Sequence, residues 1–213
     1  MPNSWLDLTF AQYSNLVALD STIEQVKMLT GLNEVELAMI DVEPIVHAIS
    51  FLNEPIDEIE PSNYINDSTL LPDDIGEESF EKKIMVVDAI KEGNIIEAIK
   101  IYSGVDVSNH SCYDVFGNFN FITKQVEAIL LKESEMLSST ITFEQQQAGI
   151  DAFDILGAFN IIDKIARDYS YTHAEVEQLS YNLVFLILLK SNITSKFEEK
   201  YNKIINDRSK FNK

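Results

Sequence analysis

The side chains that could carry chemistry are few and far apart. His47, His110 and His173 each stand alone in the sequence, and Cys112 is the only cysteine. His110 and Cys112 are close, but a structural zinc site needs four ligands and no second ligand pair accompanies them. A catalytic dyad would need two of these groups and an orienting carboxylate brought together by folding, which the spacing does not indicate. We therefore predict no catalytic, cofactor-binding or metal-binding residue.

Recognised catalytic motifs are also absent from the sequence. It holds no GxSxG nucleophile motif, no phosphate-binding glycine loop and no HExxH zinc-protease motif. Residues 73–79, DDIGEES, have the acids of a calcium loop but not its alternating ligand spacing. The residues therefore predict a protein that is not an enzyme.

The charge of the chain is strongly negative and unevenly placed. The 213 residues carry a net charge of -19, with 20 acids and 5 bases in residues 1–100 but 3 acids and 6 bases in residues 191–213. An acidic body repels a phosphate backbone, which argues against nucleic acid as a partner. The apolar residues of the basic tail fall at helical spacing, so we expect an amphipathic helix that packs on the acidic body. These residues are Phe197, Tyr201, Ile204 and Ile205.

Three features predict a cytoplasmic protein that does not enter a membrane. A single cysteine cannot form an intramolecular disulfide, which favours a reducing compartment. The first ten residues, MPNSWLDLTF, lack the basic start and apolar core of a secretory signal. The longest apolar run, residues 183–189, is far shorter than the roughly 20 residues that cross a bilayer.

The pattern of capping residues, glycines and prolines predicts an all-α fold without a strand ladder. No proline follows Pro72, which permits long helices, and Gly31 and Gly93 are placed to end helices. The capping pairs are Thr9 with Gln12, Ser21 with Glu24, Asn33 with Glu36, Asn94 with Glu97, Thr142 with Gln145, and Thr172 with Glu175. The helices are predicted at about 9–19, 22–30, 34–40, 43–52, 79–92, 95–103, 112–136, 143–170, 173–190 and 194–208.

Residues 53–78 interrupt this helical pattern. They hold three prolines and nine acids, with no apolar repeat at helical spacing. The segment is nevertheless too rich in apolar residues for a free linker, so we expect an extended arm that lies on its own chain or on a partner, with its own chain favoured. The predicted organisation is a small N-terminal helical unit (1–52), an acidic arm (53–78) and a larger C-terminal helical bundle (79–213).

The C-terminal bundle is predicted to centre on a long antiparallel helix pair, 143–170 with 173–190, joined by a short turn. Both predicted helices carry apolar stripes at three- and four-residue spacing. Gly149 and Gly157 lie on nearly one face of the first helix, where each costs about 1 kcal/mol relative to alanine. Close approach of another helix would offset that cost, either within the chain or, as the alternative, in a docking groove for a foreign helix.

Several stretches resemble proteins encoded among the tail genes of tailed bacteriophages. The opening SWLDLTFAQYSNLVAL, then GLNEVELAMI and HAISFLNEP, is similar to their Thr-Phe-x-Gln-Tyr helix, short Gly-x-x-x-Glu helix and Phe-Leu motif. Three later stretches resemble later helices of such proteins: KKIMVVDAIKEGNIIEAIKIYSG, AGIDAFDILGAFNIIDKIARD and KFEEKYNKI. The resemblance implies a tail-assembly chaperone or small virion-assembly factor, with no catalytic residue.

These observations lead to three hypotheses. The first is a non-enzymatic tail-assembly chaperone in the cytoplasm of the infected host, which binds a tail-tube or tape-measure protein. The second is a permanent component of the virion tail or neck, and the third is an acidic decoy that binds a host factor. Self-association is a further expectation, because a helical scaffold with exposed apolar faces favours it. The candidate protein-binding residues are Trp5, Leu8, Phe10, Tyr13, Ile56, Ile59, Tyr64, Ile65, Leu70 and Leu71.

Overall fold

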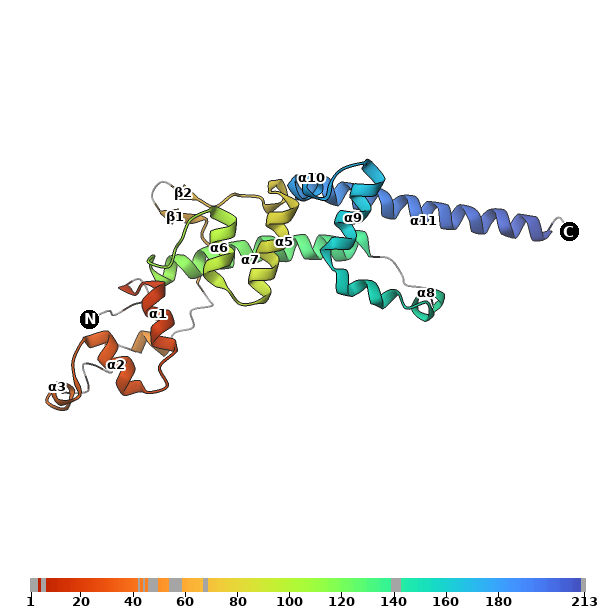
Figure 1. Ribbon diagram of the computed structural model, residues 1–213. Coiled ribbons are helices and arrows are strands. Elements are labelled where there is room, and N and C mark those ends of the chain that lie inside the picture. Colours follow the sequence, from red (N-terminus) through yellow and green to blue (C-terminus); the bar gives the residue numbers. More distant parts are fainter. Residues whose placement is uncertain are drawn as a thin grey trace. The chain divides into compact units, whose positions relative to one another are not determined.

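Helices make up most of the chain in the computed structural model (Figure 1), which confirms the predicted all-α class. The structure describes residues 4, 7–41, 43, 45, 50–53, 59–66, 69–138 and 143–211. A short antiparallel ladder pairs β1 (Tyr64–Asn66) with β2 (Thr69–Leu70), although the sequence predicted no strands. Ladders this short leave little sequence signal, because period-two alternation needs about four residues or more to be recognised.

Contacts within the chain group its residues into two units. Unit 1 comprises Met1–Asp73 and Met85–Lys124, and unit 2 comprises Asp74–Ile84 and Gln125–Lys213. Helices α5 (Phe80–Lys91) and α7 (Cys112–Leu137) contribute residues to both units. The grouping therefore differs from the three consecutive segments predicted, because most of the described arm residues belong to unit 1.

Unit 1 begins with capped helices. Its elements are α1 (Phe10–Val17), α2 (Thr22–Thr30), α3 (Glu34–Ala38), the 3-10 helix η2 (Ser50–Asn53), β1, β2, α6 (Ile95–Ser103), and parts of α5 and α7. Thr9 and Asn33 form the predicted reciprocal capping boxes, whereas the Ser21 side chain makes no capping bond. Gly31 ends α2 in the predicted left-handed conformation. Thr142 lies outside the described residues.

The core of unit 1 joins the first residues of the chain to α7. Leu8, Phe51, Ile59, Cys112 and Phe116 form one buried cluster. The Leu8 carbonyl accepts a 2.7 Å hydrogen bond from the Cys112 N–H, which fixes the chain entering α1 against the start of α7. Two rings of α1 pack on this cluster, since Phe10 and Tyr13 lie with centroids 5.7 and 5.3 Å from that of Phe116.

Residues 59–64 of the arm lie along α7 within unit 1, so this part packs on its own chain, as the favoured prediction stated. The Ser62 N–H donates to the Gly117 carbonyl at 2.9 Å, and the Asn118 amide donates to the carbonyls of Ser62 and Tyr64 at 2.8 Å. A Cβ at Gly117 would lie 3.3 Å from the Glu60 carbonyl oxygen. The glycine in α7 therefore permits this close approach of the arm.

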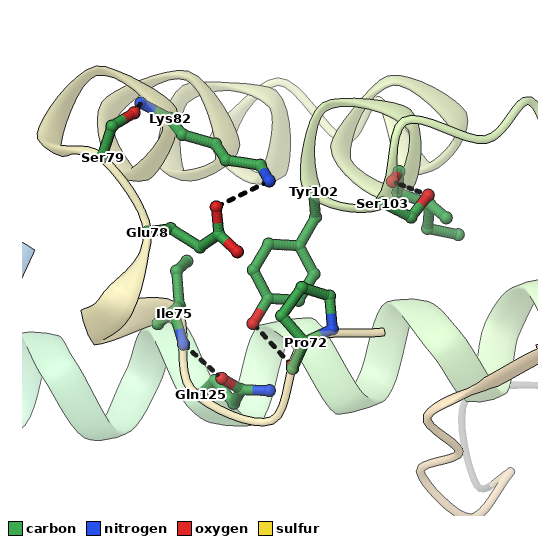
Figure 2. Close-up of polar contacts among 9 residues, drawn as sticks. Pro72, Ile75, Glu78, Ser79, Lys82, Tyr102, Ser103 and Gln125 are labelled. Carbon is green, nitrogen blue, oxygen red and sulfur yellow. Dashed lines mark hydrogen bonds and ion pairs between the residues drawn. The ribbon is translucent and has the colours of Figure 1, made fainter. Parts of the chain in front are cut away.

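Further along the arm, a buried tyrosine ties the chain to α6. The Tyr102 hydroxyl donates to the Pro72 carbonyl at 2.8 Å (Figure 2), and the Tyr102 side chain is fully buried. In unit 2, the N–H of Ile75 donates to Oε1 of Gln125 at 2.8 Å, as the same figure shows. Each side chain satisfies a backbone group that an extended segment would otherwise leave unpaired, which stabilises a stretch without regular structure.

Unit 2 is built from short helices and one long one. Its elements are the 3-10 helix η4 (Ile75–Glu77), parts of α5 and α7, α8 (Phe143–Gln147), the 3-10 helix η5 (Ile150–Leu156), α9 (Ala158–Tyr169), α10 (His173–Gln178) and α11 (Tyr181–Phe211). Helices α9 and α10 pack together across the predicted turn, where Ser170 adopts a φ of 59° and Thr172 forms a capping box.

The predicted long helix 143–170 is wrong in its continuity. It divides into α8, η5 and α9 at Gly149 and Gly157, whose φ angles of 82° and 47° lie outside the helical region. Nothing lies within 4 Å of where a Cβ would stand at either position, so neither glycine serves the close helix approach that was predicted. Both glycines instead allow the backbone to turn.

The predicted helices 173–190 and 194–208 are also divided differently. The first breaks at Leu179, whose φ and ψ of -63° and 145° are extended. The Leu179 carbonyl accepts from the Phe80 N–H, and the Tyr181 N–H donates to the Glu78 carbonyl, both at 2.8 Å. This contact with the start of α5 is non-local, so helical spacing could not reveal it. From Tyr181 the chain continues as α11 without a break.

A buried ionic cluster holds three elements of unit 2 together. The Lys83 ammonium donates to Oε1 of Glu133 at 3.0 Å, and the Tyr181 hydroxyl donates to the same oxygen at 3.0 Å. Lys83 also lies 5.1 Å from the centre of the Tyr181 ring. These contacts join α5, α7 and α11, and the Lys83 residue is only 8% exposed. Burial and the neighbouring Glu133 raise the pKa of Tyr181, which keeps its hydroxyl a donor.

Candidate protein-binding surfaces

Helix α11 has two apolar faces, of which its own chain covers one. Tyr181, Val184 and Phe185 are buried in the core of unit 2. This face ends early, because every residue from 193 to 208 is exposed. Figure 1 shows α11 continuing as one helix past α9 and α10. The second half of the helix therefore gains little stability from packing on the described residues of unit 2.

The opposite face carries an exposed apolar stripe. At about 100° per residue, its members fall within an arc of about 120° that faces away from the core side. Ile193 and Phe197 are 60% and 65% exposed, and the rings of Phe197 and Tyr201 stack with centroids 6.0 Å apart. We call this set the α11 stripe. It consists of Leu183, Leu186, Ile193, Phe197, Tyr201, Ile204 and Ile205.

Basic side chains border the α11 stripe. The helical positions place Lys196, Lys200 and Lys203 along one edge, together with Asp207, and Glu198 near the other edge. Two further bases, Lys190 and Arg208, fall within the arc of the stripe.

The sequence predicted that this basic amphipathic helix would pack on the acidic body. The described residues of unit 2 do not cover it, since residues 193–208 are all exposed. Leu186 and Ile193 were not predicted as part of the tail's apolar stripe. They lie at helical spacing from Phe197 and extend the stripe toward the predicted helix 173–190.

A hollow lies beside the stripe, between the end of α9 and α11. It is open, with a volume of about 320 Å³. Its lining mixes apolar, hydroxyl and charged groups, and its Asp168 already pairs with Lys164. The lining residues are Asp168, Tyr169, Ile187, Lys190, Ser191, Thr194 and Ser195. The hollow therefore makes the surface on this side of α11 uneven, but it is not an enclosed ligand pocket.

The first helices of unit 1 expose a second apolar region, of opposite charge. Neither α2 nor α3 has a buried residue, and Met39, which follows α3, is 81% exposed. Residues 17–41 carry five acids against one base, Lys27, which pairs with Glu34 at 3.6 Å. We call this region the N-terminal acidic surface. Its exposed apolar residues are Val17, Ile23, Val35, Met39 and Ile40.

The structure separates the predicted protein-binding residues into buried and exposed ones. Those buried in the core of unit 1 are Leu8, Ile59, Ile65 and Leu71, while Phe10 and Tyr13 pack against the same core. Tyr64 and Leu70 are exposed, at opposite positions of the β1–β2 ladder. Trp5 and Ile56 lie outside the described residues. Of the predicted arm residues that the structure describes, Tyr64 and Leu70 are therefore the ones exposed to a partner.

The cysteine and histidines, which could act as reactive groups or metal ligands, do not form a reactive site in the described residues. Burial raises the pKa of the Cys112 thiol to about 12, which leaves it protonated, and the thiol donates to the Thr9 carbonyl at 3.3 Å. Nε2 of His173 lies 3.5 Å from Asp163 on the exposed surface. His47 falls outside the described residues, among which no group of three or more potential metal ligands occurs.

No protein-family model matches the chain, and neither a curated protein nor a solved structure matches it. Across the part of the chain that the structure describes, no helix is long and apolar enough to span a membrane.

Proposed function

We propose that this chain is a non-enzymatic bacteriophage assembly protein, a chaperone that binds a tail-tube or tape-measure protein in the cytoplasm of the infected host. The observation that carries the proposal is the α11 stripe, an apolar face that the described part of its own chain leaves open. An amphipathic helix with anchors at three- and four-residue spacing is a common recognition element for another helix or groove. This matches what a chaperone for helical client proteins needs.

The location of the stripe supports binding rather than folding. Helical residues that remain exposed contribute little to the stability of their own domain, so an apolar stripe there indicates an interaction site. The large net charge opposes uncontrolled aggregation while such a face is open. The phage assignment itself rests on the resemblance of the opening helix, with Thr9, Gln12 and Tyr13, and of the later stretches to tail-gene products.

The decisive experiment is capture of partners from phage-infected cells by the tagged full-length chain. We expect a tail-tube or tape-measure protein in the eluate, identified by mass spectrometry, and we expect the double variant Phe197→Glu/Tyr201→Glu to lose it. The matched control is Phe153→Glu/Ile155→Glu, which likewise places two charges on exposed apolar residues but lies outside the stripe. Equal recovery of the tail protein by both variants would contradict the role of the stripe.

A second measurement separates the chaperone from the two alternatives. A chaperone leaves the assembled particle, so purified virions should contain the chain far below the amount of the tail proteins. Stoichiometric recovery in virions would instead identify a permanent component of the tail or neck. Capture of a host protein alone, lost when the acids of residues 53–78 become amides, would favour the acidic decoy.

A further inference from the structure

Each unit of this chain exposes an apolar surface, and opposite charges flank the two surfaces. We infer that the α11 stripe of one copy binds the N-terminal acidic surface of a second copy. The described structure leaves both surfaces exposed, with residues 193–208 all exposed and no buried residue in α2 or α3. This inference uses the α11 stripe as a binding face but does not depend on the client proposed above.

The short helices of the N-terminal acidic surface would gain stability from a covering partner. Helices below about 12 residues are marginal in water unless packing stabilises them. Helix α2 has nine residues and α3 has five, and α2 contacts the unit 1 core through the partly buried Leu29. Contact of an amphipathic helix with exposed apolar residues such as Ile23, Val35 and Met39 would add to this packing.

The charges favour binding of the α11 stripe to the N-terminal acidic surface over antiparallel binding of one α11 stripe to another. Two α11 stripes brought together antiparallel would set Lys196, Lys200 and Lys203 against the same lysines of the other copy. Against residues 17–41 these lysines instead meet an excess of acids, since five acids there face one base. Opposite charges around an apolar contact set its partner and its orientation. The chain therefore carries both halves of one complementary contact.

The inferred contact is heterologous, because it joins two different surfaces. Each copy in a pair then keeps one free stripe and one free acidic surface, so further copies can add until a ring closes or a filament grows. A client that takes the α11 stripe would compete with this association. Self-association would thus cover the stripe while no client is present.

Complementation between two variants tests this arrangement with the purified full-length chain. Phe197→Glu/Tyr201→Glu removes the stripe, and Val35→Lys/Met39→Lys removes the acidic surface; all four residues are exposed, so both variants should keep the wild-type circular dichroism spectrum. We expect sedimentation velocity to show concentration-dependent association for wild type and monomers for each variant alone. An equimolar mixture of the two variants should restore association, but only to a heterodimer.

Salt and a matched control complete the design. Raising the salt from about 0.1 M to about 1 M should weaken association of the wild type, since the flanking charges are exposed and screened. Phe153→Glu/Ile155→Glu, at exposed residues outside both surfaces, should associate as wild type does. Monomeric wild type across the concentration range would overturn the inference. So would association that survives Val35→Lys/Met39→Lys, because the stripe would then bind another surface. Both results would leave client binding to be judged by its own experiment.

Discussion

The lone thiol, Cys112, is set by its surroundings to be inert. It is fully buried in the unit 1 cluster beside Phe116, and burial raises its pKa from 9.0 to about 12. Because a thiolate is the reactive form, we expect Cys112 in the native protein to resist alkylation by iodoacetamide at pH 8 and to react rapidly in urea. Rapid labelling without denaturant would contradict the burial of this residue.

The same thiol makes stability fall in alkaline solution. Above pH about 9 the unfolded chain loses the Cys112 proton while the folded chain keeps it until about 12, so the unfolded state is favoured. This group lowers the free energy of unfolding by about 1.4 kcal/mol per pH unit within that window. Urea titrations from pH 8 to pH 10.5 should show the decline. Cys112→Ala should have a shallower slope. It also removes the smaller cause of the raised pKa of Tyr13, while the larger cause, burial, remains in both proteins.

A second prediction at this scale concerns the buried ion pair of Lys83 with Glu133. Lys83→Met leaves the carboxylate with the Tyr181 hydroxyl alone, so we expect a loss of about 2 kcal/mol in the free energy of unfolding, measured by urea denaturation. The matched control is Lys91→Met in the same helix. Lys91 pairs with Asp88 at 3.6 Å on the exposed surface, and its loss should cost less than about 1 kcal/mol. Equal effects at both positions would show that burial adds nothing to the Lys83 pair.

At the scale of elements, Gly157 decides between one long helix and the observed α8, η5 and α9. In a continuous helix, Gly157→Ala would stabilise the protein by about 1 kcal/mol. The observed φ of 47° and ψ of -127° are strained for alanine, so we expect a loss of about 1–3 kcal/mol instead. Urea denaturation gives the sign. Gly149→Ala, with a φ of 82° and open space around it, should have the same sign. Stabilisation by both would restore the continuous helix.

Capping pairs and helical spacing predicted helices whose bounds depend on neighbouring residues in the sequence. Helix α6 was predicted at its observed bounds, and the capping boxes at Thr9, Asn33 and Thr172 formed as the spacing indicated. The break at Leu179 depends on backbone bonds to residues about 100 positions away, which no local pattern records. A glycine in an amphipathic pattern is ambiguous too, because helix packing and a turn both tolerate it.

The candidate surfaces show the same division between local and non-local information. The stripe residues of the tail were recognised from helical spacing, but their environment depends on where the rest of unit 2 packs. In the arm, alternate exposure of Tyr64 and Ile65 follows from the strand β1, so the predicted binding set contained both core and surface residues. Composition alone could not separate them, since all are apolar.

For the molecule as a whole, the chain should separate into a part that folds and a tail that binds. Truncation after Asn192 removes residues 193–213, of which 193–208 are all exposed. It also removes the 3.1 Å hydrogen bond that Lys196 donates to the Ser138 carbonyl. We expect the free energy of unfolding to change by less than about 1 kcal/mol, because exposed residues contribute little packing. Urea denaturation of residues 1–192 beside the full chain measures this.

The same truncation should abolish both self-association and capture of the tail protein, because it deletes five of the seven stripe residues. Full-length Phe197→Glu/Tyr201→Glu is its matched control, since it keeps the helix and its lysines but not the apolar face. If both proteins fold and neither binds, the apolar contact is required and charge alone does not suffice. A truncated chain that unfolds would instead show that the tail belongs to its own fold, and would contradict the exposure on which the α11 stripe depends.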